Sequence, residues 1–153
     1  MKTNLLKKHA KSFYWASFFL SNDVFRKCSS LYNFCRTLDD IVDDDNKLEI
    51  KKEIFFKFKK DFLNKNPNNQ IINDMWSLIN SENISKKIVI DIFDGFETDL
   101  EEKVKINSKK DLLVYSYRVA GTVGLMMSKI LKVSNRDSLR GAIDLGIAMQ
   151  LTN

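Results

Sequence analysis

The segment from Arg36 to Asp45 holds the residues of this chain whose types and spacing could do chemistry, because five of its ten residues are aspartates. If the segment is helical, residues four apart share a face, so Asp39 and Asp43 project from one side one turn apart. Carboxylates crowded at the C-terminal end of a helix repel one another and the helix dipole. A divalent cation such as Mg²⁺ would offset that cost, since it is commonly held by one or two carboxylates together with phosphate oxygens.

Tyr32 and Arg36 precede the two aspartates on the same face. Tyr32, Arg36, Asp39 and Asp43 are spaced at i, i+4, i+7 and i+11, so the four side chains would lie along one side of a helix. Arginine can bind a phosphate through two parallel hydrogen bonds. The spacing alone leaves two interpretations open: a metal and phosphate site, or a solvated acidic helix end that leads into a turn.

Two further stripes near the C-terminus combine small and polar residues. In the first, Gly121 and Gly124 adjoin Tyr115, Val119 and Val123, and each glycine costs about 1 kcal/mol relative to alanine inside a helix. The second stripe places Ala142, Gly146, Gln150 and Asn153 on one face at i, i+4, i+8 and i+11. Tight helix packing explains both stripes as well as a ligand groove does, and the two amides could be solvated.

The elements that must position these residues are predicted to be helices, because their apolar residues recur with helical spacing. We expect helices over Val24 to the aspartates, Lys47–Leu63, Ile71–Ile79, Lys86–Glu102, Lys109–Leu131 and Asn135–Asn153. Ser21, Ser85, Ser108 and Ser134 stand where N-caps of four of them would lie. The chain lacks an alternation of strands and helices, so we predict an all-α fold in a single domain over residues 1–153 without an internal boundary.

Composition narrows the class of protein. The chain has 153 residues, 44% of them hydrophobic, one proline and a formal charge of +5, which suits one largely helical domain and is compatible with contact at an anionic membrane surface. It lacks the basic stripe of a nucleic-acid-binding protein. Cys28 and Cys35 lie about 10 Å apart along one helix, too far for a disulfide, so we expect reduced thiols and a cytoplasmic or peripherally membrane-associated protein.

Four motifs resemble, in order, those of the squalene/phytoene synthase family of head-to-head prenyltransferases. They are His9-Ala10-Lys11-Ser12-Phe13, Leu31 to Arg36 with the following Asp39 to Asp43, Tyr115 to Gly124, and Leu145 to Asn153. The sequence of the third motif is most similar to that of bacterial phytoene synthases. The resemblance implies an all-α isoprenoid-synthase fold around a central apolar cavity that binds two prenyl diphosphates with Mg²⁺ or Mn²⁺.

The resemblance also implies roles for individual residues. Asp39 and Asp43 would bind the metal and, with Arg36 and Tyr32, form the catalytic group, while Ser12 would lie near the diphosphate. The remaining matches are substrate-binding residues, which are Tyr115, Val119, Val123, Gly124 and Ala142 along the prenyl channel and the polar pair Gln150 and Asn153, of which Asn153 would also be a metal ligand. Taken alone, Ser12 could equally be an ordinary helix serine.

The sequence departs from the family pattern in two places. Ala10 stands where many members carry a serine, and the second acidic motif would begin beyond Asn153, so we expect this chain to be the N-terminal portion of the enzyme. The implied reaction joins two geranylgeranyl diphosphates to phytoene through a cyclopropyl diphosphate. A squalene or dehydrosqualene synthase that uses farnesyl diphosphate, and a non-catalytic helical subunit, remain as alternatives. The use of NADPH and the oligomeric state are left open.

Overall fold

All regular secondary structure in the described part of the chain, residues 19–101 and 106–152, is helical in this computed structural model. The helices are α3 (Asn22–Asp43), α4 (Leu48–Leu63), α5 (Gln70–Ser81), α6 (Lys86–Thr98), α7 (Lys109–Ser116), the π-helical turn η2 (Tyr117–Gly121), α8 (Thr122–Ile130) and α9 (Arg136–Thr152). This order confirms the predicted all-α fold. No helix among the described residues is long and apolar enough to cross a bilayer.

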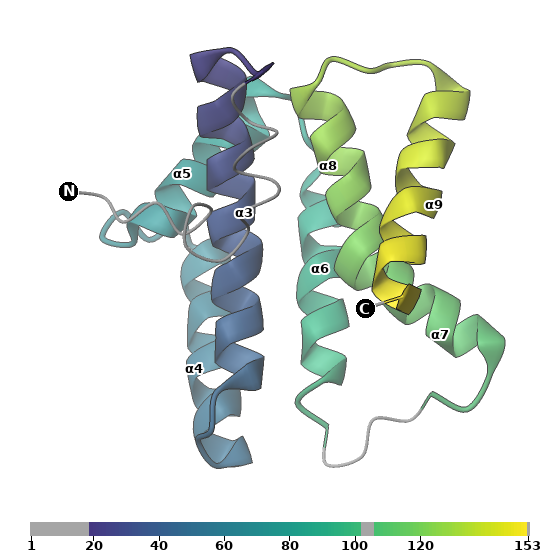
Figure 1. Cartoon of the computed structure of the whole chain (residues 1–153). Coiled ribbons are helices and arrows are strands. Elements are labelled where there is room, and N and C mark those ends of the chain that lie inside the picture. The colour runs from purple at the N-terminus through teal and green to yellow at the C-terminus, as the bar shows by residue number, and fades with distance from the viewer. Residues whose placement is uncertain (1–18, 102–105, 153) are drawn as a thin grey trace.

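Helix α3 holds the two sides of the bundle together. It contacts α4 and α5 on one side and α6 and α8 on the other, and Figure 1 shows α9 on the far side of α8 with α7 below it. Four apolar residues at helical spacing, Leu31, Phe34, Leu38 and Val42, are buried on α3. The burial of this stripe sets the rotation of the helix, and it therefore determines where the adjoining polar face of α3 points.

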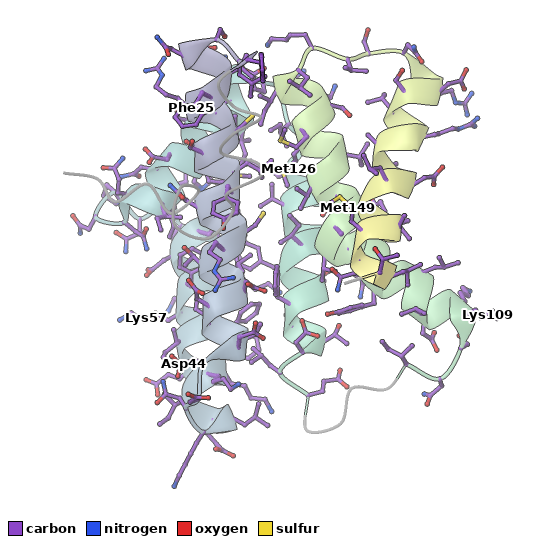
Figure 2. The ribbon with its side chains drawn as sticks, in the orientation of Figure 1. Phe25, Asp44, Lys57, Lys109, Met126 and Met149 are labelled. Atoms are coloured by element: carbon purple, nitrogen blue, oxygen red, sulfur yellow. The ribbon has the colours of Figure 1, made fainter. Side chains whose placement is uncertain are left out.

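Aromatic rings fill the core beside α3. The Phe34 ring lies 5.5 Å from that of Phe62 on α4 and 5.7 Å from that of Phe93 on α6. Trp76 stacks on Phe62 and donates its indole N–H to the Phe62 carbonyl at 2.8 Å, which satisfies a backbone group at the end of α4. Met126, labelled on α8 in Figure 2, is fully buried in the same core. These contacts hold α3, α4, α5 and α6 as one packed unit.

Three of the four predicted N-caps are confirmed. The side-chain oxygens of Ser21, Ser85 and Ser108 accept hydrogen bonds from the first turns of α3, α6 and α7. The fourth prediction is wrong, because Asn135 rather than Ser134 caps α9: its Oδ1 accepts from the backbone N–H groups of Asp137 and Ser138 at 2.9 Å each.

Two predicted helices differ from those observed. Helix α6 ends at Thr98 rather than Glu102, and Asp99 is its C-cap. The predicted Lys109–Leu131 helix is interrupted by η2, where the N–H of Thr122 bonds to the Tyr117 carbonyl five residues back. The hydroxyl of Thr122 donates to the Arg118 carbonyl at 2.7 Å and supports the widened turn. Such insertions are frequent at functional sites.

Candidate active site

A groove of about 550 Å³ opens where five elements meet. Its walls come from α3, the end of α6, α7, η2 and the C-terminal part of α9. The residues that line it are Tyr32, Cys35, Arg36, Asp39, Val42, Asp43, Phe96, Asp99, Tyr115, Val119 and Gln150. Acidic and aromatic side chains thus face one another across the groove, beside apolar positions on α6 and η2.

The α3 wall presents the predicted face of Tyr32, Arg36, Asp39 and Asp43 to the groove. The Arg36 guanidinium bonds to Asp39 at 2.8 Å and to Asp40 at 2.7 Å. Its Nε is buried and has no hydrogen-bond partner within residues 19–101 and 106–152. Arg36 therefore keeps one buried donor unsatisfied, and its guanidinium would have to move before that donor could meet a bound anion.

Ionisation of the carboxyl groups in this wall has an electrostatic cost. Burial raises the pKa of Asp39, the neighbouring charge of Asp43 raises that pKa further, and Arg36 opposes the shift. A bound divalent cation would relieve both the burial and the repulsion, and carboxylate oxygens are the donors that Mg²⁺ prefers. No three metal-binding side chains converge in the described ranges, so Asp39 and Asp43 would hold an ion together with ligand oxygens and water.

Cys35 lies in the same wall. Burial raises the pKa of its thiol to about 12 in the metal-free chain, with a smaller contribution from the charge of Asp39. Because Mg²⁺ prefers oxygen ligands to sulfur, the carboxylates rather than this thiol are its candidate ligands in this wall.

The opposite wall carries Asp99 and Tyr115, whose hydroxyl donates to Asp99 Oδ2 at 3.1 Å. Burial raises the pKa of Asp99, the Tyr115 hydrogen bond opposes that shift, and the charges of Asp43 and Asp39 add to it. Asp99 was not predicted from the sequence. It lies three residues after Phe96, at the C-cap of α6, but its partner is 16 residues away in the sequence, and no local pattern marks such a pair.

The structure places the other predicted site residues in three locations. Val119 and Gln150 line the groove with Tyr115. Val123 packs against the core, and Gly124 lies against α9, where an added Cβ would come within 2.1 Å of the Ala142 carbonyl oxygen. Val123, Gly124 and Ala142 thus contribute to helix packing and are not among the residues that line the groove. Ser12 and Asn153 lie outside the described residues.

The chain is similar to known proteins over most of its length. The squalene/phytoene synthase family model matches residues 6–153. The 15-cis-phytoene synthase of Pantoea ananas is 30% identical over 94% of this chain and 50% of its own length. The phytoene synthase of Rhodobacter capsulatus is 31% identical over 97% of this chain and 45% of its own.

Solved structures show the same arrangement of helices. A dehydrosqualene synthase superposes with a TM-score of 0.76 and 32% identity, over 97% of this chain and 52% of that one. The squalene synthase HpnC of Alicyclobacillus acidocaldarius shares the fold, with a TM-score of 0.73 at 19% identity over 95% of this chain and 56% of its own. The chain spans about half the length of these relatives. The chain belongs to the squalene/phytoene synthase family.

Proposed function

We propose that this chain carries the first diphosphate-binding half of a head-to-head prenyltransferase that joins two geranylgeranyl diphosphates to phytoene. The observation that carries the proposal is the groove in which Arg36, Asp39 and Asp43 face Tyr115 and Val119. Members of this family bind prenyl diphosphates. The groove pairs a charged end suited to a diphosphate with aromatic and apolar walls suited to a prenyl chain.

Each residue of the α3 wall has a separate task in the proposed reaction. Asp39 and Asp43 would hold Mg²⁺ or Mn²⁺, which neutralises the diphosphate as it leaves. Arg36 would turn its guanidinium from the neighbouring aspartates towards the phosphate oxygens, where charge develops in the transition state. Tyr32 lies one turn before Arg36 and would complete the catalytic group at the same end. Ser12 and Asn153, the latter as a further metal ligand, remain part of this proposal on the resemblance alone.

The remaining lining would bind and shield the prenyl chain. Tyr115 and Val119 form the wall opposite α3, with Gln150 beside them, and the apolar surface would keep water from the carbocation. Val123, Gly124 and Ala142 would support this wall indirectly, through the packing of α8 against the core and against α9. The cyclopropyl diphosphate expected as the intermediate would form in the groove, against this wall.

Farnesyl diphosphate is the second candidate substrate. It is favoured by the likeness to a solved dehydrosqualene synthase, which is 32% identical and spans the same helices. The relatives named phytoene synthase are 28–31% identical, so identity does not separate the two chain lengths. The depth of the complete channel decides between them.

Turnover of the two diphosphates tests the proposal. The longest reading frame that encodes this chain is expressed, its product is incubated with Mg²⁺ and either geranylgeranyl or farnesyl diphosphate, and released diphosphate and the hydrocarbon product are measured. We expect release from geranylgeranyl diphosphate with formation of a C40 product. A C30 product from farnesyl diphosphate would move the assignment to dehydrosqualene or squalene synthesis, and no release from either substrate would favour a non-catalytic helical subunit.

A further inference from the structure

Asp99 occupies a position that ordinary folding preferences do not explain. It caps the C-terminal end of α6, where the helix dipole disfavours a negative charge. It is also half-buried and shares the groove with Asp39 and Asp43, whose charges act on it. Three separate electrostatic effects therefore oppose the charge of Asp99. A residue that is retained against the stability of the chain is a candidate for a functional role.

The contact that Asp99 makes identifies what it could do. Tyr115 donates its hydroxyl hydrogen to Asp99 at 3.1 Å, across 16 residues of sequence. A half-buried phenol without such an acceptor would hold a water molecule at its hydroxyl instead. In a groove that has to exclude water from a cation, an ordered water at the wall would be harmful. The acceptor on Asp99 thus both orients the ring and removes the need for that water.

We propose that Asp99 is a positioning residue, whose carboxylate holds the Tyr115 hydroxyl and fixes its ring as a dry wall of the prenyl groove. The occupant of the groove rests on the proposed function, whereas the hydrogen bond and its electrostatic cost do not. Asp99 acts through Tyr115 and does not contact the reacting atoms. Its effect on ligand binding should therefore vanish when the Tyr115 hydroxyl is absent.

A double-mutant cycle on the present chain tests this dependence. Binding of geranylgeranyl thiodiphosphate, an unreactive prenyl diphosphate analogue, is measured by calorimetry with Mg²⁺ for wild type, Asp99→Ala, Tyr115→Phe and the double variant. We expect Asp99→Ala to weaken binding about 5- to 10-fold, as the loss of one hydrogen bond implies. In the Tyr115→Phe background the same change should have less than about a 2-fold effect. Equal effects in both backgrounds would overturn the proposal.

A conservative variant and a matched control separate positioning from structural support. Asp99→Asn keeps an acceptor and removes the charge, so binding should recover to within about 2-fold of wild type while the melting temperature rises by about 1–3 °C. Asp94→Asn, on the same helix, breaks an ion pair with Lys59 at 3.3 Å outside the groove. It should lower the melting temperature and leave binding unchanged. A fall in melting temperature for Asp99→Asn as large as that for Asp94→Asn would show a structural role.

The titration of the phenol gives a readout without any ligand. Burial raises the pKa of Tyr115, and the charge and hydrogen bond of Asp99 raise it further. The ultraviolet difference between wild type and Tyr115→Phe isolates this one phenol. Asp99→Ala should shift its ionisation to lower pH, and an unchanged titration would contradict the contact. If wild type fails to bind the analogue, the proposed function fails while this titration still decides the role of Asp99.

Discussion

Asp39 and Asp43 of the proposed site carry charges that oppose folding of the chain. They lie one turn apart on α3, and Arg36 is bonded to Asp39 and Asp40 rather than to Asp43. The pKa of Asp39 is raised above its unfolded value, so its ionisation opposes folding as the pH rises through that pKa. At neutral pH the charged pair therefore lowers the stability of the chain without a cation.

Asp43→Asn should relieve this repulsion. We expect the pKa of Asp39 to fall and the melting temperature at pH 7 without divalent ions to rise by about 1–2 °C. The pKa is measured by carbon NMR of the carboxyl group and the melting temperature by circular dichroism. Asp45→Asn, an exposed change beyond the end of α3, is the control. A lower melting temperature for Asp43→Asn would mean that its carboxylate supports the fold.

The residues of the site were predictable to different degrees. Helical spacing was enough to place Tyr32, Arg36, Asp39 and Asp43 on one face, because the geometry of a helix is local. Asp99 could not be predicted, since its meeting with Tyr115 depends on how α6 and α7 pack. The resemblance linked Tyr115 and Gln150 to the site, which periodicity alone did not.

At the scale of elements, α9 is held by backbone approach rather than by large buried side chains. It has no fully buried residue, yet an added Cβ at Gly146 would lie 2.4 Å from the Ala120 carbonyl oxygen and 3.1 Å from the Gly121 Cα. Within the small-residue stripe of the sequence, Gly146 thus lies at the seam between α9 and η2, and Ala142 lies at the contact with α8. Packing by this seam places Gln150 in the groove.

Gly146→Ala should disrupt the seam. The methyl group meets backbone atoms that cannot rotate away, so we expect a loss of about 1–3 kcal/mol in the free energy of unfolding. Gly141→Ala, five residues earlier on α9, has open space around it and should gain up to about 1 kcal/mol from helix propensity. Urea denaturation of both variants measures the difference. Equal stability of the two would contradict the close approach.

Glu82 joins three elements at the other end of the bundle. Its side chain is 1% exposed, and it accepts hydrogen bonds from Lys27 on α3, at 2.8 Å, and from Lys132 after α8. These bonds, that of Lys132 foremost, lower the pKa of Glu82. A carboxyl group with a lowered pKa stabilises the fold above its unfolded pKa, and that stability is lost as the pH falls through the folded pKa.

Glu82→Gln should remove this contribution. We expect a loss of about 1–3 kcal/mol in the free energy of unfolding at pH 7, because a buried charge-assisted acceptor is replaced by a weaker one. The difference from wild type should shrink below about pH 4.5, where the unfolded carboxyl is protonated. Denaturation at pH 7 and at pH 3.5 measures the difference in free energy of unfolding at each pH. A difference that is the same at the two pH values would argue against an ionised Glu82.

The boundaries of the helices were only partly predictable from this sequence. Caps at Ser21, Ser85 and Ser108 were predictable, because each satisfies backbone groups of its own first turn. The π-turn η2 was not, since Gly121 and Thr122 also fit an ordinary helix. Its widened turn lies where α6 approaches closely: a Cβ on Gly95 would come within 2.8 Å of Val119 Cγ1. Such a contact is set by tertiary packing.

For the whole molecule, burial is distributed unevenly. The core of α3, α4, α5 and α6 is dense with buried aromatic side chains, whereas α9 exposes Leu145 at 63% and Met149 at 41%. Figure 2 labels Met149 on α9. Because α9 buries few large side chains, we expect weak cooperativity of unfolding for this chain.

Native-state hydrogen exchange should distinguish α9 from the core helices α3 and α6. We expect amides of α9 to exchange through local opening, with free energies at least about 2 kcal/mol below those of α3 and α6, because few buried contacts must break to release α9. Exchange measured by NMR or mass spectrometry against low denaturant gives both values. The same protection in α9 and α3 would show a single cooperative unit.

The proposed function requires that α3 presents a metal-dependent diphosphate site. Calorimetric titration of this chain with geranylgeranyl thiodiphosphate, with Mg²⁺ and with excess EDTA, checks this requirement for wild type, Asp39→Asn and Asp45→Asn. We expect binding that requires Mg²⁺, a loss of at least about 10-fold for Asp39→Asn, and no change for Asp45→Asn. Binding by wild type that persists in EDTA, or an Asp39→Asn variant that binds like wild type, would contradict it.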